Sequence, residues 1–190
     1  TRPFHLGHLH VTRADLSREF DVAIVGCGIV GAACAAELSA AGCRVCVLES
    51  GPIGGGATAA GMGHVVVMDD SPAQLALTAY SRRLWRALAP ALPERAEYEA
   101  CGTLWVAADA EEMAAVVRKQ STLASAGVTS RVLSSTELAQ EEPNLRRGLA
   151  GGLLVPDDLV VYPPVVAQYL LDRALAAGAQ DFLTKPLDHA

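Results

Sequence analysis

The stretch FDVAIVGCGIVGAACAAELSAAGCRVCVLES, residues 20–50, decides the fold. The run DVAIVG at its start is apolar and β-branched, which predicts a strand buried on both faces. Alanines and Leu38 follow at helical spacing, and Gly42 stands where a helix C-terminus favours a residue that tolerates positive φ. RVCVLE, which ends at Glu49, predicts a second buried strand. The stretch therefore predicts a βαβ unit with parallel strands and a right-handed crossover.

Three glycines between the first strand and the helix match the pattern G-x-G-x-x-G. Gly26 permits a tight turn, Gly28 lets the backbone approach a pyrophosphate, and Gly31 lets the helix pack closely on the sheet. The helix N-terminus then presents free N–H groups to the phosphates. Because the pattern lies inside a βαβ unit, it indicates a dinucleotide site; the alternative is a structural turn without a ligand.

Glu49 lies eighteen residues beyond Gly31, at the end of the second strand. A carboxylate there accepts hydrogen bonds from adenosine ribose hydroxyls and disfavours a 2′-phosphate, which argues against NADP. FAD and NAD share this turn, so the choice rests on a second glycine- and alanine-rich loop, GGGATAAGMGHV at residues 54–65. Such a loop can pack its backbone against a larger cofactor, with Thr58 as a hydroxyl donor, and this favours FAD.

Composition narrows the class of protein. The 190 residues carry 15 basic and 21 acidic side chains, and this net charge of −6 argues against a nucleic-acid partner. Five cysteines, an odd number, indicate buried thiols of a reducing compartment, the cytoplasm. The apolar stretch 22–38 contains glycines and Glu37, so we expect no membrane span, and we expect no metal site.

The remaining patterns predict further helices and strands. We expect a helix from Ser71 that ends before Pro90, a strand over 97–109, a helix over 110–127, a short strand and then a helix over 136–142, a strand–turn–strand over 151–164, a helix over 164–179 and a strand from 181. The fold class is α/β: a Rossmann-like βαβ domain with part of an inserted α+β domain, whose parallel sheet is incomplete because the chain stops after a strand.

The quoted stretch, the loop GGGATAAGMGHV and the segment GGLLVPDDLVVYPPVVAQYLLDRALAAGA (residues 151–179) together resemble the D-amino-acid oxidase-like family of FAD-dependent oxidoreductases. That family includes glycine and sarcosine oxidases and D-amino-acid dehydrogenases. The resemblance implies hydride transfer from the C–N bond of a small amino acid, imino acid or amine to FAD. We expect a leader over residues 1–19, and the resemblance implies an FAD-binding domain (20–95), a partial substrate domain (96–147) and the return to the FAD-binding domain (148–190).

The resemblance also implies which residues contact the cofactor. The pyrophosphate would lie against Gly26, Gly28, Val30 and Gly31, the adenosine against Glu49 and Ser50, and the flavin side against Ala57, Thr58, Ala60, Gly61, Met62 and Gly63. Family members are longer and carry their substrate-anchoring residues in a later region, so no catalytic residue is assigned. The alternatives are a non-catalytic truncated fragment, one half of a split flavoenzyme with a partner subunit, or an NAD-binding domain.

Four other groups of polar residues have structural interpretations. His64 follows the presumed flavin loop and is read as a structural histidine, with an acid–base role as the alternative. Asp69 and Asp70 precede a helix start. Asp157 and Asp158 are expected in a turn, and Arg82, Arg83 and Arg86 on a solvated helix face.

Overall fold

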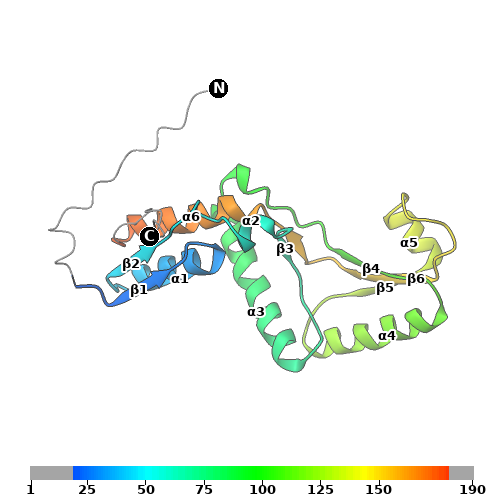
Figure 1. Ribbon diagram of the computed structural model, residues 1–190. Coiled ribbons are helices and arrows are strands. Elements are labelled where there is room, and N and C mark those ends of the chain that lie inside the picture. The colour runs from blue at the N-terminus through cyan, green and yellow to red at the C-terminus, as the bar shows by residue number, and fades with distance from the viewer. Residues whose placement is uncertain (1–18, 180–190) are drawn as a thin grey trace, which may run out of the picture. The chain divides into compact units, whose positions relative to one another are not determined.

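The computed structural model describes residues 19–179 (Figure 1). The chain divides into two compact units, and we describe each by itself. Of the described residues, 19–60 and 163–179 form unit 1, and Gly61–Tyr162 form unit 2. The expected α/β class is confirmed, with small, partial sheets. The four functional parts predicted from the sequence are a separate division of the chain and stay a prediction.

Unit 1 contains the predicted βαβ unit. Strands β1 (Val22–Val25) and β2 (Val45–Leu48) pair in parallel, with Val22 opposite Val45. Helix α1 (Ile29–Ala40) connects them. Within the described residues, β1 and β2 form a two-stranded sheet, so each of the two strands has one unpaired edge.

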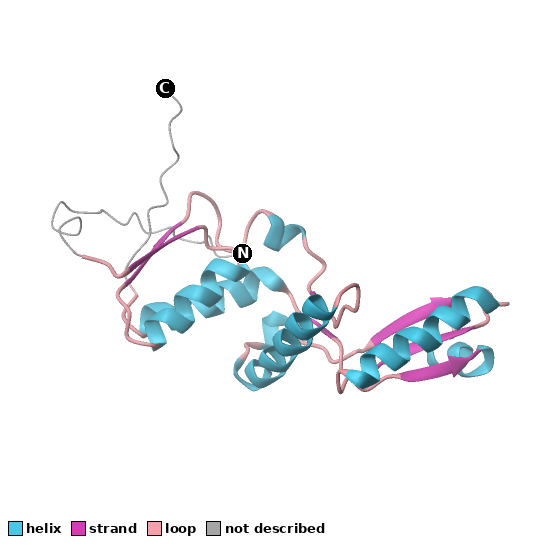
Figure 2. Cartoon of the chain, turned by 90° about the horizontal axis from the view of Figure 1, so that it is seen from below, coloured by secondary structure: helices cyan, strands magenta, loops and turns pink. Residues whose placement is uncertain are grey.

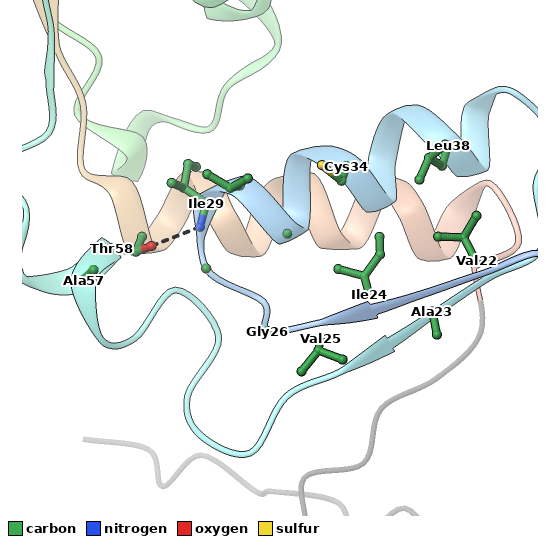
Figure 3. A pocket seen from close by; sticks show the side chains of 13 residues that line it. Val22, Ala23, Ile24, Val25, Gly26, Ile29, Cys34, Leu38, Ala57 and Thr58 are labelled. Carbon is green, nitrogen blue, oxygen red and sulfur yellow. Dashed lines mark hydrogen bonds between the residues drawn. The ribbon is translucent and has the colours of Figure 1, made fainter.

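Helix α6 (Pro163–Ala176) packs along α1, although the two helices lie far apart in the sequence (Figure 3). The buried side chains of α1 are all small: Ala32, Ala35, Ala36 and Ser39. Small side chains let two helix backbones approach closely, so the alanine-rich composition of α1 has a packing reason. A single helical turn, α2 (Ala57–Ala60), completes the unit and lies inside the segment expected to be a loop.

Unit 2 is built on an antiparallel sheet with strand order β4–β6–β5. The strands are β4 (Thr103–Ala107), β5 (Arg131–Ser134) and β6 (Gly151–Val155). Helix α4 (Ala110–Ser125) covers one face, where Val116 and Leu123 pack against Leu153 and Val155. Helix α5 (Ser135–Glu141) lies on the other side, as Figures 1 and 2 show.

The remaining elements of unit 2 surround a second, smaller sheet. Strands β3 (His64–Val65) and β7 (Leu159–Val160) pair antiparallel, with His64 opposite Val160. Helix α3 (Pro72–Leu88) starts as predicted, because Ser71 caps it by accepting a hydrogen bond from the Gln74 N–H at 3.2 Å. Two 3₁₀ turns follow, at Ala89–Ala91 and Glu94–Ala96. The strand expected over 97–109 is shorter, because only Thr103–Ala107 pairs with β6.

The expectation for the arginines of α3 is wrong for one of them. Arg82 is buried, and its guanidinium pairs with Asp158 at 2.7 Å. Arg86 pairs with Asp157 at the same distance but is half-exposed. Asp157 lies in the expected turn between β6 and β7 and Asp158 directly follows it, and both also form ion pairs that sequence spacing does not reveal.

The predicted leader and the predicted strand from residue 181 lie outside the described residues. Between residues 19 and 179, no helix combines the length and the apolar character that crossing a membrane requires.

Candidate dinucleotide-binding site

The turn from β1 into α1 has the form that the three glycines predict. Gly26 adopts a φ of 95°, a conformation that side-chain-bearing residues avoid. A Cβ on Gly31 would collide with the carbonyl oxygen of Gly26, so the first turn of α1 lies directly against the end of β1. The turn is therefore compact because two of its residues lack a side chain.

Thr58 closes this turn from α2, as Figure 3 shows. Its hydroxyl oxygen accepts a hydrogen bond from the N–H of Ile29 at 3.0 Å. A Cβ on Gly28 would lie 2.8 Å from the same oxygen. Gly28 thus makes room for Thr58, a contact that the sequence pattern does not reveal.

The next two N–H groups of α1 are free to bind a ligand. Within residues 19–179, the N–H groups of Val30 and Gly31 have no hydrogen-bond acceptor. Unpaired N–H groups and the helix dipole together favour an anion at this position. The side chain of Val30 is exposed and leaves the approach to these groups open.

Glu49 connects the end of β2 to the turn. One carboxylate oxygen accepts a hydrogen bond from the Cys27 N–H at 2.6 Å, and the other accepts one from the Gly51 N–H at 2.8 Å. These two bonds, the first above all, lower the pKa of the Glu49 carboxyl below its ordinary value. A carboxylate offers about four lone-pair sites, so Glu49 keeps sites for ribose hydroxyls.

An open pocket of about 720 Å³ runs along β1 and the adjoining side of α1 (Figure 3). None of the residues that line it is acidic, and most are apolar. The lining residues are Val22, Ala23, Ile24, Val25, Gly26, Gly28, Ile29, Val30, Gly31, Cys34, Leu38, Ala57 and Thr58.

The structure brings most of the predicted residues together in unit 1. Six of them line the pocket: Gly26, Gly28, Val30, Gly31, Ala57 and Thr58. Glu49 contacts the turn through Cys27, and Ser50 follows it at an exposed position. Ala60 ends α2 and is exposed.

Three predicted residues belong to unit 2 instead: Gly61, Met62 and Gly63. The carbonyl oxygen of Gly63 accepts a hydrogen bond from the Val161 N–H at 3.0 Å, and Met62 is exposed. His64 is exposed at the start of β3.

Sequence reasoning missed the part played by Cys27 and Gly54. Cys27 is fully buried; its N–H donates to Glu49, and its carbonyl oxygen accepts from the Gly54 N–H at 2.9 Å. Burial, reinforced by the charge of Glu49, raises the pKa of the Cys27 thiol to about 11, so the thiol stays neutral. The variable position of G-x-G-x-x-G gives no signal for this role, whereas the run of three glycines at 54–56 does indicate a close approach.

No group of three His, Cys, Asp or Glu side chains within the described part of the chain is arranged to hold a metal ion.

Comparisons with known proteins agree with this geometry. Residues 21–189 match the model of a family described as FAD dependent oxidoreductase. The chain belongs to this family. Its cofactor is FAD, as the family's description states. The family resemblance inferred from the motifs is thus confirmed.

Several known proteins are similar to this chain in sequence and structure. A glycine oxidase from Geobacillus kaustophilus is 33% identical over 172 residues, which cover 86% of this chain and 46% of the relative. Its crystal structure matches with a TM-score of 0.75, covering 85% of this chain and 45% of that one. The crystal structure of an iminodiacetate oxidase from Chelativorans matches with a TM-score of 0.69 at 28% identity, covering 83% of this chain and 45% of that one. The chain therefore spans less than half the length of these relatives.

The residues at the turn fit the pyrophosphate of FAD. Gly28 and Gly31 let the turn pack tightly against Thr58 and the Gly26 carbonyl oxygen, and the N–H groups of Val30 and Gly31 lack acceptors within the described residues. The pocket beside them carries no negative charge. An anionic group that needs backbone donors and close contact fits these features.

Proposed function

We propose that this chain binds FAD and takes part in oxidising the C–N bond of a small amino acid, imino acid or amine. The observation that carries the proposal is the Glu49–Cys27 hydrogen bond, which joins the carboxylate at the end of β2 to the glycine turn. FAD, when bound, supplies the hydride acceptor. The residues of this chain bind and orient it.

The predicted contacts divide by the part of FAD that each would hold. Gly26, Gly28, Val30 and Gly31 would hold the pyrophosphate through backbone N–H groups. Glu49 would accept bonds from the ribose hydroxyls, with Ser50 beside it. Ala57, Thr58, Ala60, Gly61, Met62 and Gly63 would line the flavin side. The adjacency of Glu49, Thr58 and the glycine turn supports these assignments within unit 1.

A second candidate is a non-catalytic FAD-binding piece or one half of a split flavoenzyme. This candidate accords with the coverage of the relatives, since this chain covers 46% of the length of the glycine oxidase from Geobacillus kaustophilus. In that case a partner subunit or a C-terminal half would supply the substrate-anchoring residues. We also propose a cytoplasmic location, supported by the odd number of cysteines, five, in the sequence.

Titration of the purified chain with FAD, followed by flavin fluorescence, tests the proposal. We expect Gly28→Val to weaken FAD binding by about a hundredfold or more, since its methyls would lie against Thr58 and the pyrophosphate position. Gly51→Ala is the matched control, because its Cβ would make only an ordinary contact, 3.7 Å from Glu49. Equal affinities of Gly28→Val and wild type would contradict the site.

Anaerobic addition of glycine, sarcosine or D-alanine to the FAD-loaded chain separates the two candidates. Loss of the oxidised flavin absorption supports oxidation of an amino acid by this chain. Retained FAD that none of these compounds reduces supports the non-catalytic candidate.

A further inference from the structure

Two ion pairs connect α3 to residues 157–158, between β6 and β7. Arg82 contacts Asp158 and Arg86 contacts Asp157, each with an Nη1–Oδ1 distance of 2.7 Å. They differ in burial: Asp158 is 1% exposed and Arg82 is 8% exposed, whereas the side chains of Arg86 and Asp157 are 53% and 34% exposed. The two pairs join the same elements and lie one helical turn apart on α3.

Burying the Arg82–Asp158 ion pair costs free energy. Removing two charges from water carries a desolvation penalty that their attraction does not always offset. The pair makes a single hydrogen bond, and the second carboxylate oxygen of Asp158, Oδ2, has no partner within residues 19–179. An apolar pair would fill such a place without these penalties, so the ion pair is better explained by a role in positioning its neighbours.

Asp158 leads directly into the strand that holds the predicted flavin loop. Its carbonyl oxygen accepts a hydrogen bond from the Gly102 N–H at 2.9 Å, and β7 begins at the next residue. Strand β7 pairs with β3, and the Val161 N–H donates to the carbonyl oxygen of Gly63. A path of direct contacts therefore runs from Arg82 through Asp158 and β7 to Gly63.

The other edge of this strand is also held. The Val160 and Glu99 backbones exchange two hydrogen bonds, and the Tyr162 N–H donates to the Ala96 carbonyl oxygen at 2.7 Å. Residues 158–162 thus lie between the segment at Gly63–Val65 and the segment at 96–102. Movement of Asp158 would displace the strand that both segments use for pairing.

We propose that Arg82 and Asp158 are positioning residues, which hold β7 in register and thereby fix residues 61–65. This inference rests on the proposed function in one respect: residues 61–63 are taken to face the flavin. The pair acts through β7 and touches neither FAD nor substrate in this proposal. The ion pair, β7 and residues 61–65 all belong to unit 2, so the proposed positioning takes place within that unit.

Hydrogen exchange of the FAD-free chain, resolved by peptide mass spectrometry, tests this role. In Arg82→Met and Asp158→Asn, we expect exchange at residues 61–65, 96–102 and 159–162 to be at least about tenfold faster, because each variant leaves a buried group uncompensated. Arg86→Met and Asp157→Asn remove the exposed pair between the same elements and should leave exchange unchanged. Exchange across β4, β6 and β5 is the internal control.

Each outcome decides the proposal. Faster exchange confined to 61–65, 96–102 and 159–162 supports it, because these segments pair with one another. Unchanged exchange overturns it, and so does an increase spread over the whole β4–β6–β5 sheet, which would mean a general structural role. If Arg82→Met does not fold, Arg82→Lys replaces it: the pair has one hydrogen bond, so a lysine should restore protection.

FAD titration of the same variants tests the step toward the cofactor. We expect Asp158→Asn to bind FAD about tenfold more weakly than Asp157→Asn. If exchange at residues 61–65 becomes faster while the affinity for FAD is unchanged, the conformation of residues 61–65 does not affect FAD binding. If the wild-type chain binds no FAD, the proposed function fails, and the exchange data still decide what the ion pair holds.

Discussion

At the scale of single residues, Glu49 has two tasks. Its carboxylate accepts the N–H groups of Cys27 and Gly51, and by proposal the ribose hydroxyls as well. Hydrogen bonds to an ionised carboxylate are stronger than those between neutral groups. The residue that would select the cofactor therefore also holds the glycine turn against the end of β2.

This double task predicts a pH-dependent effect of Glu49→Gln on the stability of unit 1. The folded-state pKa of Glu49 is below its ordinary value of 4.5. Its contribution is therefore complete above that value and is lost as the pH falls through the folded-state pKa. We expect Glu49→Gln to lower the free energy of unfolding by about 1 kcal/mol near neutral pH, and by progressively less in acid.

Urea unfolding followed by circular dichroism, from about pH 7 to about pH 3, measures this difference. Glu37→Gln, an exposed carboxylate on α1 of the same unit, controls for the loss of one negative charge. If Glu49→Gln changes the free energy of unfolding by the same amount at every pH, the charge of Glu49 does not strengthen its hydrogen bonds to Cys27 and Gly51.

At the scale of elements, the loop at 51–56 joins the glycine turn to α6. The Gly54 N–H bonds the Cys27 carbonyl oxygen, and a Cβ on Gly54 would lie 2.8 Å from the Cα of Pro164. Gly54 thus lies between the turn and the first residues of α6. Gly56 has a φ of 57°, close to the 67° of Gly54. A Cβ on Gly56, however, would meet no atom within 4 Å.

The pair Gly54→Ala and Gly56→Ala separates backbone strain from close approach. Both substitutions place a side chain in the left-handed region, which costs about 1–2 kcal/mol. Gly54→Ala must in addition displace the backbone of α6, so we expect it to cost roughly 1–3 kcal/mol more. Urea unfolding measures the free energy of unfolding of the two variants. Equal values would show that α6 can move away from residue 54 without loss of stability.

Helix starts were predictable because capping is local. Ser71 and Pro72 begin α3 as expected, and Ser134 with Glu137 forms a capping box at α5, close to the predicted start. The one-turn helix α2 was not predictable. Four residues carry too little pattern to be recognised as a helix, and α2 is stabilised by its contacts with the glycine turn and α6.

At the scale of the whole molecule, both tryptophans, Trp85 and Trp105, lie in unit 2, whereas the proposed FAD contacts at Gly26–Glu49 lie in unit 1. A ligand that binds only the folded form of one unit stabilises that unit, by about 2.7 kcal/mol at a free concentration of a hundred times Kd. The two units can therefore be followed separately.

We expect FAD to shift the unfolding curve measured by circular dichroism, which includes α1 and α6, by more than it shifts the tryptophan fluorescence curve, because residues 61–63 are the part of unit 2 proposed to contact FAD. Unit 1 should also unfold first without FAD, because a two-stranded sheet is marginally stable. Urea titrations with both signals check this. Coincident curves that move together with FAD would show that the units unfold as one.

The sequence by itself determined the βαβ unit, the glycine turn and the family. Each depends on residues close in the chain, where apolar periodicity and the conformational range of glycine act directly. The tertiary structure alone reveals three contacts: the hydrogen bond between Thr58 and Ile29, the buried ion pair of Arg82 with Asp158, and the backbone hydrogen bond between Gly54 and Cys27. These contacts join residues separated by 27 to 76 positions. Which distant polar groups meet depends on how helices and strands pack, and no local pattern encodes that.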